Sequence, residues 1–285
     1  GFSGDGGPAS AAQVRFPLDV SLDAAGNIYI ADSNRIRRLG ANGIINTIAG
    51  TGAAGFSGDG GPALSATMEG VTRVAADSAG NIYLCDRGND RIRKIDTNGI
   101  INTIAGTGVN GPLGDGGPAA SASICEPEAI ALDSSGVLYI CDTYNYRIRK
   151  VVNGTISTVV GNGMKGFSGD GGPATAASIG AVYGLTVDAS NNVIFCDSTN
   201  HRIRKLDSSG NITTIGGIGA PGFSGDGGDA LAAKLNFPYA ISSSSRGLFV
   251  VDAANNRVRR IRANTAPALQ DVTVSQDPVK TSTDV

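Results

Sequence analysis

The stretch Gly-Phe-Ser-Gly-Asp-Gly-Gly at residues 1–7 returns with little change at Gly55, Gly166 and Gly222, and a degenerate copy begins at Gly111. Each copy contains one aspartate in the same register: Asp5, Asp59, Asp115, Asp170 and Asp226. Successive aspartates are 54, 56, 55 and 56 residues apart. Such regular self-similarity marks a tandem repeat, so both fold and function must be inferred from the repeat unit.

Repeat two shows the internal pattern of the unit. Four short runs that read as strands occupy residues 71–77, 82–86, 91–96 and 100–106. Turn-forming residues separate them, including the hairpin signal Asn98-Gly99. No window has helical periodicity over the length that a helix needs. The repeat therefore predicts a four-stranded antiparallel meander, joined to the next by a glycine-rich connection.

A repeated four-stranded meander of this length predicts an all-β fold, a β-propeller, whose blades pack around a central channel. Both faces of each blade would then be covered, which explains continuous apolar runs such as Ile28-Tyr29-Ile30. A solenoid of stacked sheets is the competing architecture.

The sequence also resembles a known family. The runs Gly-Asn-Ile-Tyr-Ile-Ala-Asp at 26–32, Asn-Asp-Arg-Ile-Arg-Lys at 89–94 and Asn-Arg-Val-Arg at 256–259 look like NHL repeats. The resemblance covers residues 1–262 and implies a propeller, most often six-bladed, that binds partners more often than it catalyses. The long-repeat form with the insertion Gly-Phe-Ser-Gly-Asp-Gly-Gly-Pro-Ala resembles repeats of large secreted or surface proteins.

Only five repeats are visible, starting near residues 1, 55, 111, 166 and 222, so the complete propeller is expected to have five or six blades. The fifth lacks an obvious fourth strand after residues 259–262, and closure needs a strand from elsewhere. Residues 263–285 are a linker, a closing strand with Val272 and Val274 as the candidate run, or the start of a following extracellular module. The chain also opens inside a repeat motif, which indicates a segment of a longer polypeptide.

Charge and composition narrow the function classes. The formal net charge of −2 argues against general electrostatic binding of nucleic acid, although an RNA-binding NHL domain stays an alternative. No apolar run is long enough to cross a bilayer, so no membrane insertion is expected. Cys85, Cys141 and Cys196 share a register that holds Ala31 and Val251 in the other repeats, which indicates small buried side chains. Cys125 lies outside this register, and the sequence leaves its pairing open.

In a meander the connections alternate between two faces, so the glycine-rich loops and the turns between second and third strands share one rim. The five loop aspartates named above would form a circle there, a possible binding rim. The structural alternative, which we favour, is that each aspartate bonds to nearby amides, while the phenylalanines of the loops fill gaps between blades. These are Phe2, Phe56, Phe167 and Phe223. Calcium binding by the loops is possible, but one aspartate per loop is weak support.

A second set of aspartates ends each second strand and precedes an arginine across a short turn. We interpret these as structural turn pairs, in which the carboxylate caps the turn and pairs with that arginine or its neighbour. The pairs are Asp32 and Arg35, Asp86 and Arg91, Asp142 and Arg147, Asp197 and Arg202, and Asp252 and Arg257. Arg93 and the matching arginines are expected between blades or at their outer edge.

Catalysis has few candidates, and no catalytic or metal-binding residue is predicted. His201 is the single histidine, in a turn position where it is expected to be a solvated variant. Only Glu69, Glu126 and Glu128 break the repeat as the site of a calcium-dependent propeller hydrolase or lyase would, and such an enzyme is the alternative function.

The leading interpretation is a non-enzymatic extracellular or cell-surface interaction or structural module, without a cofactor. Its partners would be other proteins, copies of itself in a filament or surface layer, or glycans, but not nucleic acid. Asn153 and Asn211 begin glycosylation sequons in exposed turns, so the module is also a candidate glycoprotein.

Overall fold

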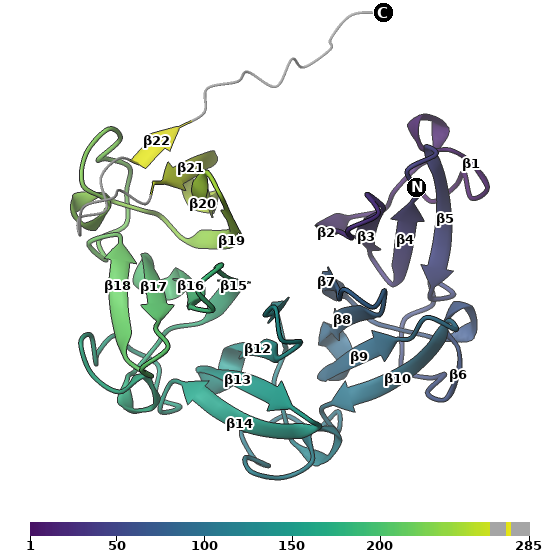
Figure 1. Ribbon diagram of the computed structural model, residues 1–285, viewed down its shortest axis with the longest axis horizontal. Helices are drawn as coiled ribbons and strands as arrows, with labels where there is room; N and C mark the ends of the chain where they lie inside the picture. Colours follow the sequence, from purple (N-terminus) through teal and green to yellow (C-terminus); the bar gives the residue numbers. More distant parts are fainter. Residues whose placement is uncertain (263–271, 275–285) are drawn as a thin grey trace, which may run out of the picture.

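The computed structural model describes residues 1–262 and 272–274 of the chain. It shows five antiparallel sheets arranged in an arc around a centre (Figure 1). Each sheet is a meander in which strands that follow one another in sequence are neighbours. The predicted all-β propeller of four-stranded repeats is thereby confirmed.

Every blade begins with its innermost strand and ends at the perimeter. Blade one contains β2 (Pro17–Leu22), β3 (Ile28–Asp32), β4 (Arg35–Leu39) and β5 (Ile44–Ala49). Blade two contains β7 (Val71–Ala76), β8 (Ile82–Asp86), β9 (Arg91–Ile95) and β10 (Ile100–Ala105). Blade three contains β11 (Ile130–Leu132), β12 (Leu138–Asp142), β13 (Arg147–Val152) and β14 (Thr155–Val160). Blade four contains β15 (Val182–Val187), β16 (Val193–Asp197), β17 (Arg202–Leu206) and β18 (Ile212–Gly216). Blade five contains β19 (Pro238–Ser244), β20 (Gly247–Asp252), β21 (Arg257–Ile261) and β22 (Val272–Val274).

The glycine-rich insertion runs along the outer edge of its own blade. In the first two blades it forms the two-residue strands β1 (Gly7–Pro8) and β6 (Gly61–Pro62), which pair with β5 and β10. A short 3₁₀ turn then leads toward the inner strand in every blade: η1 (Ala9–Ala11), η2 (Ala63–Ser65), η4 (Ala119–Ser121), η6 (Ala174–Ala176) and η8 (Ala230–Ala232).

A second set of 3₁₀ turns joins the second and third strands of blades two to five: η3 (Arg87–Asn89), η5 (Thr143–Asn145), η7 (Ser198–Asn200) and η9 (Ala253–Asn255). Each ends in a residue with left-handed backbone angles, such as Asp90 with φ of 52°. Blade one is two residues shorter here, and a tight turn with Ser33 at φ of 58° replaces the 3₁₀ turn. No helix among the described residues is long and apolar enough to cross a membrane.

The hydrophobic core lies between blades rather than within one sheet. Four clusters of buried side chains occupy the four junctions between successive blades. Cys196, for example, packs at the junction of blades four and five, and its matching residues Cys85 and Cys141 are also fully buried. Most side chains in the four clusters are aliphatic, and burying one large aliphatic side chain is worth about 1.5–3 kcal/mol. Each blade therefore depends on its neighbours for stability.

The arc is open between blade one and blade five (Figure 1). At its C-terminal end, β22 pairs with β21 and takes the place of the fourth strand. The predictions of a linker or a further module for the rest of residues 263–285 lie outside the described residues.

Candidate binding site among the inner strands

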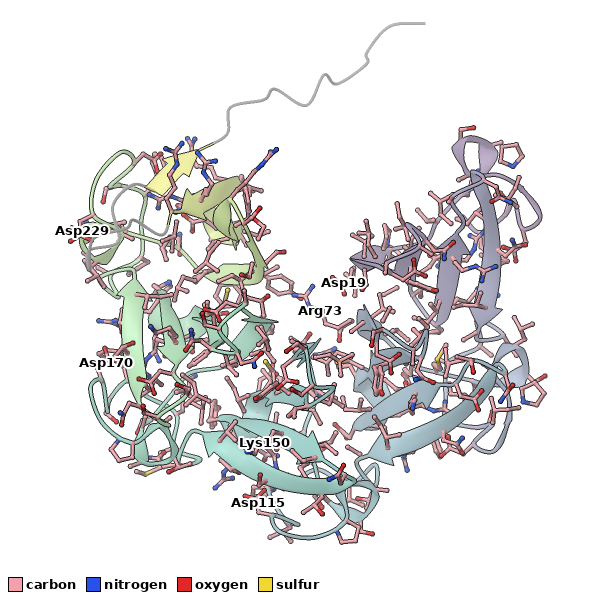
Figure 2. The ribbon with its side chains drawn as sticks, in the orientation of Figure 1. Asp19, Arg73, Asp115, Lys150, Asp170 and Asp229 are labelled. Atoms are coloured by element: carbon pink, nitrogen blue, oxygen red, sulfur yellow. The ribbon has the colours of Figure 1, made fainter. Side chains whose placement is uncertain are left out.

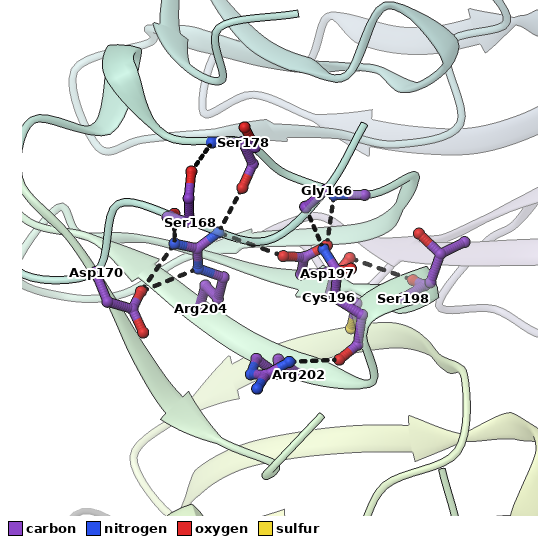
Figure 3. A network of polar contacts seen from close by, with 12 residues as sticks. Gly166, Ser168, Asp170, Ser178, Cys196, Asp197, Ser198, Arg202 and Arg204 are labelled. Atoms are coloured by element: carbon purple, nitrogen blue, oxygen red, sulfur yellow. Dashed lines mark hydrogen bonds and ion pairs between the residues drawn. The ribbon is translucent and has the colours of Figure 1, made fainter. Parts of the chain in front are cut away.

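One buried arginine organises the outer half of every blade. In blade four, Arg204 is fully buried and its Nη2 lies 2.8 Å from the Asp170 Oδ1, while Nη1 lies 3.4 Å from the Asp197 Oδ2 (Figure 3). The same guanidinium donates to the carbonyls of Ser168 and Ser178, at 2.7 and 3.1 Å. The matching residues in the other blades are Arg37, Arg93, Arg149 and Arg259. The arginine therefore ties the loop aspartate to the aspartate that ends the second strand.

This arrangement corrects the predicted turn pairs. Asp197 pairs with Arg204, two residues beyond the expected Arg202. Arg202 instead lies 3.7 Å from the centre of the Phe167 ring and donates to the Ile218 carbonyl. Because Arg204 also lies over that ring, at 4.9 Å, the phenylalanine makes cation–π contacts with two guanidinium groups rather than acting only as an apolar plug.

Each loop aspartate already has a partner, because it pairs with the buried arginine of its own blade. Side-chain exposed fractions range from 31% for Asp226 to 44% for Asp115, so one edge of each carboxylate remains accessible. Their use as a binding rim stays a prediction. The aspartates that end the second strands are more deeply buried than the loop aspartates. Desolvation raises the pKa of Asp86 and of Asp142 to about 6, because it outweighs the hydrogen bonds and the nearby arginines.

A second group of polar and aromatic side chains gathers where the inner strands begin. Arg73 extends from β7 toward the centre of the arc, next to Asp19 of β2 (Figure 2). Its Nη1 lies 3.1 Å from the Asp19 Oδ1, and its Nη2 donates to the Tyr183 carbonyl of blade four at 3.0 Å. Its guanidinium also lies 6.0 Å from the ring centre of Tyr239 in blade five. One side chain of blade two thus contacts three other blades.

Aromatic rings form the neighbouring part of this group. Tyr183 stacks on Tyr239 with ring centres 5.3 Å apart and lies 5.3 Å from Phe237. The hydroxyl groups of Tyr144 and Tyr183 are 3.1 Å apart, and Tyr144 is 41% exposed. Large aromatic side chains are otherwise rare in this chain, at 5% of residues, so their concentration here is notable.

Acidic residues complete the group. Glu128, which is 5% exposed, lies 2.6 Å from the Nε of Arg87, and the same arginine bonds to Glu126. Desolvation raises the pKa of Glu128 and of Asp19 in spite of their arginine partners. We call these side chains the inner-strand cluster: Asp19, Arg73, Arg87, Glu126, Glu128, Tyr144, Tyr183, Phe237 and Tyr239.

Sequence reasoning singled out Glu126 and Glu128 but missed the rest of the cluster. A signal was available in the aligned repeats. The matching inner-strand positions 18, 72, 128, 183 and 239 hold Leu, Thr, Glu, Tyr and Tyr, although residues around them repeat closely. Positions at which otherwise similar blades diverge are the places where a repeat protein can build a unique site.

Comparison with known families agrees with this architecture. A family model described as NHL repeat matches residues 125–151, and a model described as Teneurin NHL domain matches residues 2–55. The chain is an NHL-repeat β-propeller. The resemblance read from the Asn-Arg-Ile-Arg type runs of the sequence is confirmed.

The relatives of this NHL propeller include teneurins. Mouse Teneurin-3 is 28% identical over 275 residues, which is 92% of this chain. Human Teneurin-4 is 30% identical over 227 residues, or 70% of the chain. In both cases the match covers 8% of the relative, so the chain spans a small part of these proteins.

Solved structures show the same fold at low sequence identity. A chain of a nidogen/laminin complex superposes with a TM-score of 0.60 at 17% identity, covering 91% of this chain and 84% of that one. A streptogramin B lyase superposes with a TM-score of 0.58 at 16% identity, covering 95% of this chain and 72% of the lyase. Identities this low support the propeller fold alone.

His201 has a structural role that the sequence did not indicate. The side chain is half-buried, and its Nδ1 accepts a hydrogen bond of 3.1 Å from the Phe237 amide of the next NHL blade. The ring nitrogen must be unprotonated for this bond, so the proton of the neutral ring is on Nε2. Burial, with a smaller contribution from Arg202, lowers the pKa of His201.

A pH dependence follows from this contact. Because the folded pKa lies below the unfolded value of about 6.5, the histidine contributes its full stability above that pH. Stability is lost as the pH falls below the unfolded pKa toward the folded one. His201→Asn should reduce the loss, since Asn34 accepts the matching bond from Gly70 in blade one. Urea unfolding of both proteins at pH 7.5 and pH 5.5 measures the difference, and an equal loss in both would contradict the assignment.

The remaining predicted residues are placed as follows. The four cysteines are free thiols, with Cys125 half-buried. No group of three His, Cys, Asp or Glu side chains within residues 1–262 and 272–274 is arranged to hold a metal ion. Calcium binding by the loops stays a prediction. Asn153 is exposed at a turn with φ of 49°, whereas Asn211 is half-buried and forms an isolated antiparallel β-bridge with Pro173. The sequon that begins at Asn153 is therefore the more accessible of the two.

Proposed function

We propose that this NHL propeller is a non-enzymatic interaction module, located outside the cell or at its surface, that binds another protein through the inner-strand cluster. The observation that supports the proposal is the composition of the cluster. Tyrosine, phenylalanine and arginine converge there from blades two to five, and these residue types are enriched in protein interfaces and their hot spots. The teneurin relatives and the setting implied by the long-repeat resemblance support the location.

The geometry of the cluster also suits recognition. Tyr183, Phe237 and Tyr239 brace one another, and Arg73 is fixed by Asp19 and by a backbone carbonyl, so little side-chain freedom remains to be lost on binding. Tyr144, which is 41% exposed, offers the accessible ring. A partner with an acidic or hydroxyl-bearing group could also bond to Arg87, which is 36% exposed.

Binding to an array of purified cell-surface ectodomains tests the proposal. Tyr144→Ala is expected to weaken binding to the partner at least about tenfold, the effect of losing a moderate hot spot of about 1.4 kcal/mol. Lys150→Ala on β13 of the same blade, outside the cluster, is the matched control and should bind normally. If Tyr144→Ala keeps the wild-type melting temperature and binds like the control, the cluster is not the partner site.

The other readings have distinct signatures. A calcium-dependent hydrolase or lyase would turn over lactone or ester substrates and lose activity on chelation. An RNA-binding domain would show affinity for RNA that falls steeply with salt.

Assembly into a filament or surface layer is the alternative within the interaction class. Electron microscopy of the protein from its native source would then show filaments or sheets instead of discrete particles. Asn153→Gln would remove a glycan if the accessible sequon is used.

A further inference from the structure

A groove of about 460 Å³ lies between blades three and four, and none of the residues of the inner-strand cluster lines it. Its volume falls within the range of about 300–1,000 Å³ that is typical of small-molecule sites. The floor is a row of side chains on blade three, where Lys150 projects from β13 (Figure 2). Tyr139 and Ser157 are the register partners of Lys150 on the neighbouring strands, so the three side chains lie beside one another on one face of the sheet.

Blade four supplies the opposite wall of the groove. Its apolar part is formed by Val193 and Leu206, which are register partners on β16 and β17. Its polar part comes from η6, from the turn between β15 and β16 and from the turn between β17 and β18: Thr175, Asn191, Asp207 and Ser208. The groove therefore presents hydroxyl, amide, ammonium and carboxylate groups beside an aromatic ring and an aliphatic surface.

The first two junctions have the same kind of floor without this wall. The matching rows are Tyr29, Arg38 and Asn46 in blade one and Tyr83, Lys94 and Asn102 in blade two. On the facing blades, the position of Thr175 holds an apolar residue, Leu64 or Ala120, and the position of Asn191 holds glycine. Positions at which otherwise similar blades diverge are where a repeat protein can build a unique site, and here both divergent side chains line one groove.

Asn191 has a backbone conformation that the first three blades give to glycine. Its φ is 58°, in the left-handed region, and the matching residues Gly26, Gly80 and Gly136 have φ of 81°, 88° and 81°. A side chain is disfavoured there relative to glycine, so blade four keeps an amide in the groove at some cost in stability. The Asn191 Oδ1 accepts one long hydrogen bond of 3.4 Å from the Ser134 Oγ of blade three. Its amide nitrogen has no partner among the described residues, which leaves both N–H groups available to a ligand.

The other polar groups of the groove also have unused hydrogen-bonding capacity. Four of these side chains make no hydrogen bond or ion pair within the described part of the chain: Lys150, Ser157, Thr175 and Ser208. Asp207 accepts hydrogen bonds from the amides of Ser209 and Asn211, both at 2.9 Å, through Oδ1 alone. The second carboxylate oxygen therefore remains available as an acceptor.

We propose that this groove binds a neutral saccharide. Lys150 and Asp207 line it together, so their opposite charges balance and do not favour an ionic ligand. The hydroxyl and amide groups both donate and accept hydrogen bonds, as the hydroxyls of a sugar do. The ring of Tyr139 and the aliphatic surface of the wall suit the C–H faces of a sugar ring. The site is separate from the inner-strand cluster and is thus independent of the protein binding proposed above.

Two variants that copy the protein's own repeats test the proposal. The whole chain is screened on an array of neutral glucose, mannose, galactose and N-acetylglucosamine oligosaccharides, and the best binder is titrated by calorimetry. Asn191→Gly and Thr175→Leu should each weaken binding at least about tenfold, because each removes a hydrogen-bonding group from the groove. Asn191→Gly should keep or raise the melting temperature, since glycine suits the left-handed backbone. Ala120→Leu, which places the same leucine at the preceding junction, is the matched control and should bind like the wild type.

Three results would overturn the proposal. The first is no binding to any neutral oligosaccharide at millimolar concentration. The second is equal affinity of Asn191→Gly, Thr175→Leu and Ala120→Leu, which would place the saccharide elsewhere. The third is tighter binding of a sulfated oligosaccharide, which would assign the groove to an anion. Lys150→Ala should weaken saccharide binding although it leaves partner binding through the inner-strand cluster unchanged, so the two proposals can fail separately.

Discussion

Replacing Arg204 by methionine is expected to lower the free energy of unfolding by about 3–5 kcal/mol, the typical cost of removing one partner from a buried ion pair. The arginine is fully buried and its loss leaves Asp197, itself buried, without a cation 3.4 Å away. Asp170 loses its partner too, and two backbone carbonyls lose a donor. Urea unfolding followed by circular dichroism measures the change.

Three further variants make this result specific. Arg204→Lys should also be destabilising, because an ammonium group cannot reproduce the planar fork that reaches four acceptors. Lys205→Met, at the next position of the same strand, should change stability by no more than about 0.5 kcal/mol. Combining Arg204→Met with Asp170→Asn and Asp197→Asn should recover part of the loss, since no buried charge is left unpaired. If Arg204→Met is as stable as Lys205→Met, the buried arginine does not hold the blade together.

Gly106→Ala is expected to be the second large effect, because this glycine lies where two blades meet. It has φ of +92°, and a Cβ there would lie 2.3 Å from the Asp90 carbonyl oxygen and 2.9 Å from the Ile124 Cδ1 of blade three. The left-handed backbone costs a residue with a side chain about 1–2 kcal/mol, and forcing apart a packed junction adds about 1–3 kcal/mol.

Gly99→Ala is the matched control for this prediction. Gly99 lies in the same blade with φ of +77°, but a Cβ there would meet nothing within 4 Å. It should therefore show the backbone cost alone. Denaturant midpoints of the two variants isolate the contribution of the junction, and equal midpoints would mean that blades two and three can separate locally without cost.

The strands and the propeller were predictable because their signals are local. Alternating apolar runs, Asn-Gly turns and the spacing of the loop aspartates all lie within one repeat of about 55 residues. The ion pairs were less predictable. Arg202 and Arg204 lie on the same side of β17, and the choice between them depends on the position of the loop that carries Asp170, 34 residues earlier in the chain.

The contacts between blades were hidden from the sequence. His201 bonds to Phe237, which is 36 residues away, and Arg73 reaches the Tyr183 carbonyl across 110 residues. The separation of 36 residues recurs between Asn34 and Gly70 and between Asp90 and Glu126, but no pattern within one repeat indicates that these residues meet. Comparing the repeats position by position would have found the inner-strand cluster, although not its partners.

The short strands β1 and β6 have a consequence for how such a molecule can grow. An uncovered outer strand would present free amides and carbonyls to any passing chain. In the first two blades the insertion pairs with that strand and ends in Pro8 or Pro62, which have no amide hydrogen to extend the ladder. The outer edge of these two blades is thus closed to lateral recruitment of strands. A repeat that carries this insertion therefore brings its own cover for the outer strand, and two such repeats can lie side by side without an adhesive outer edge.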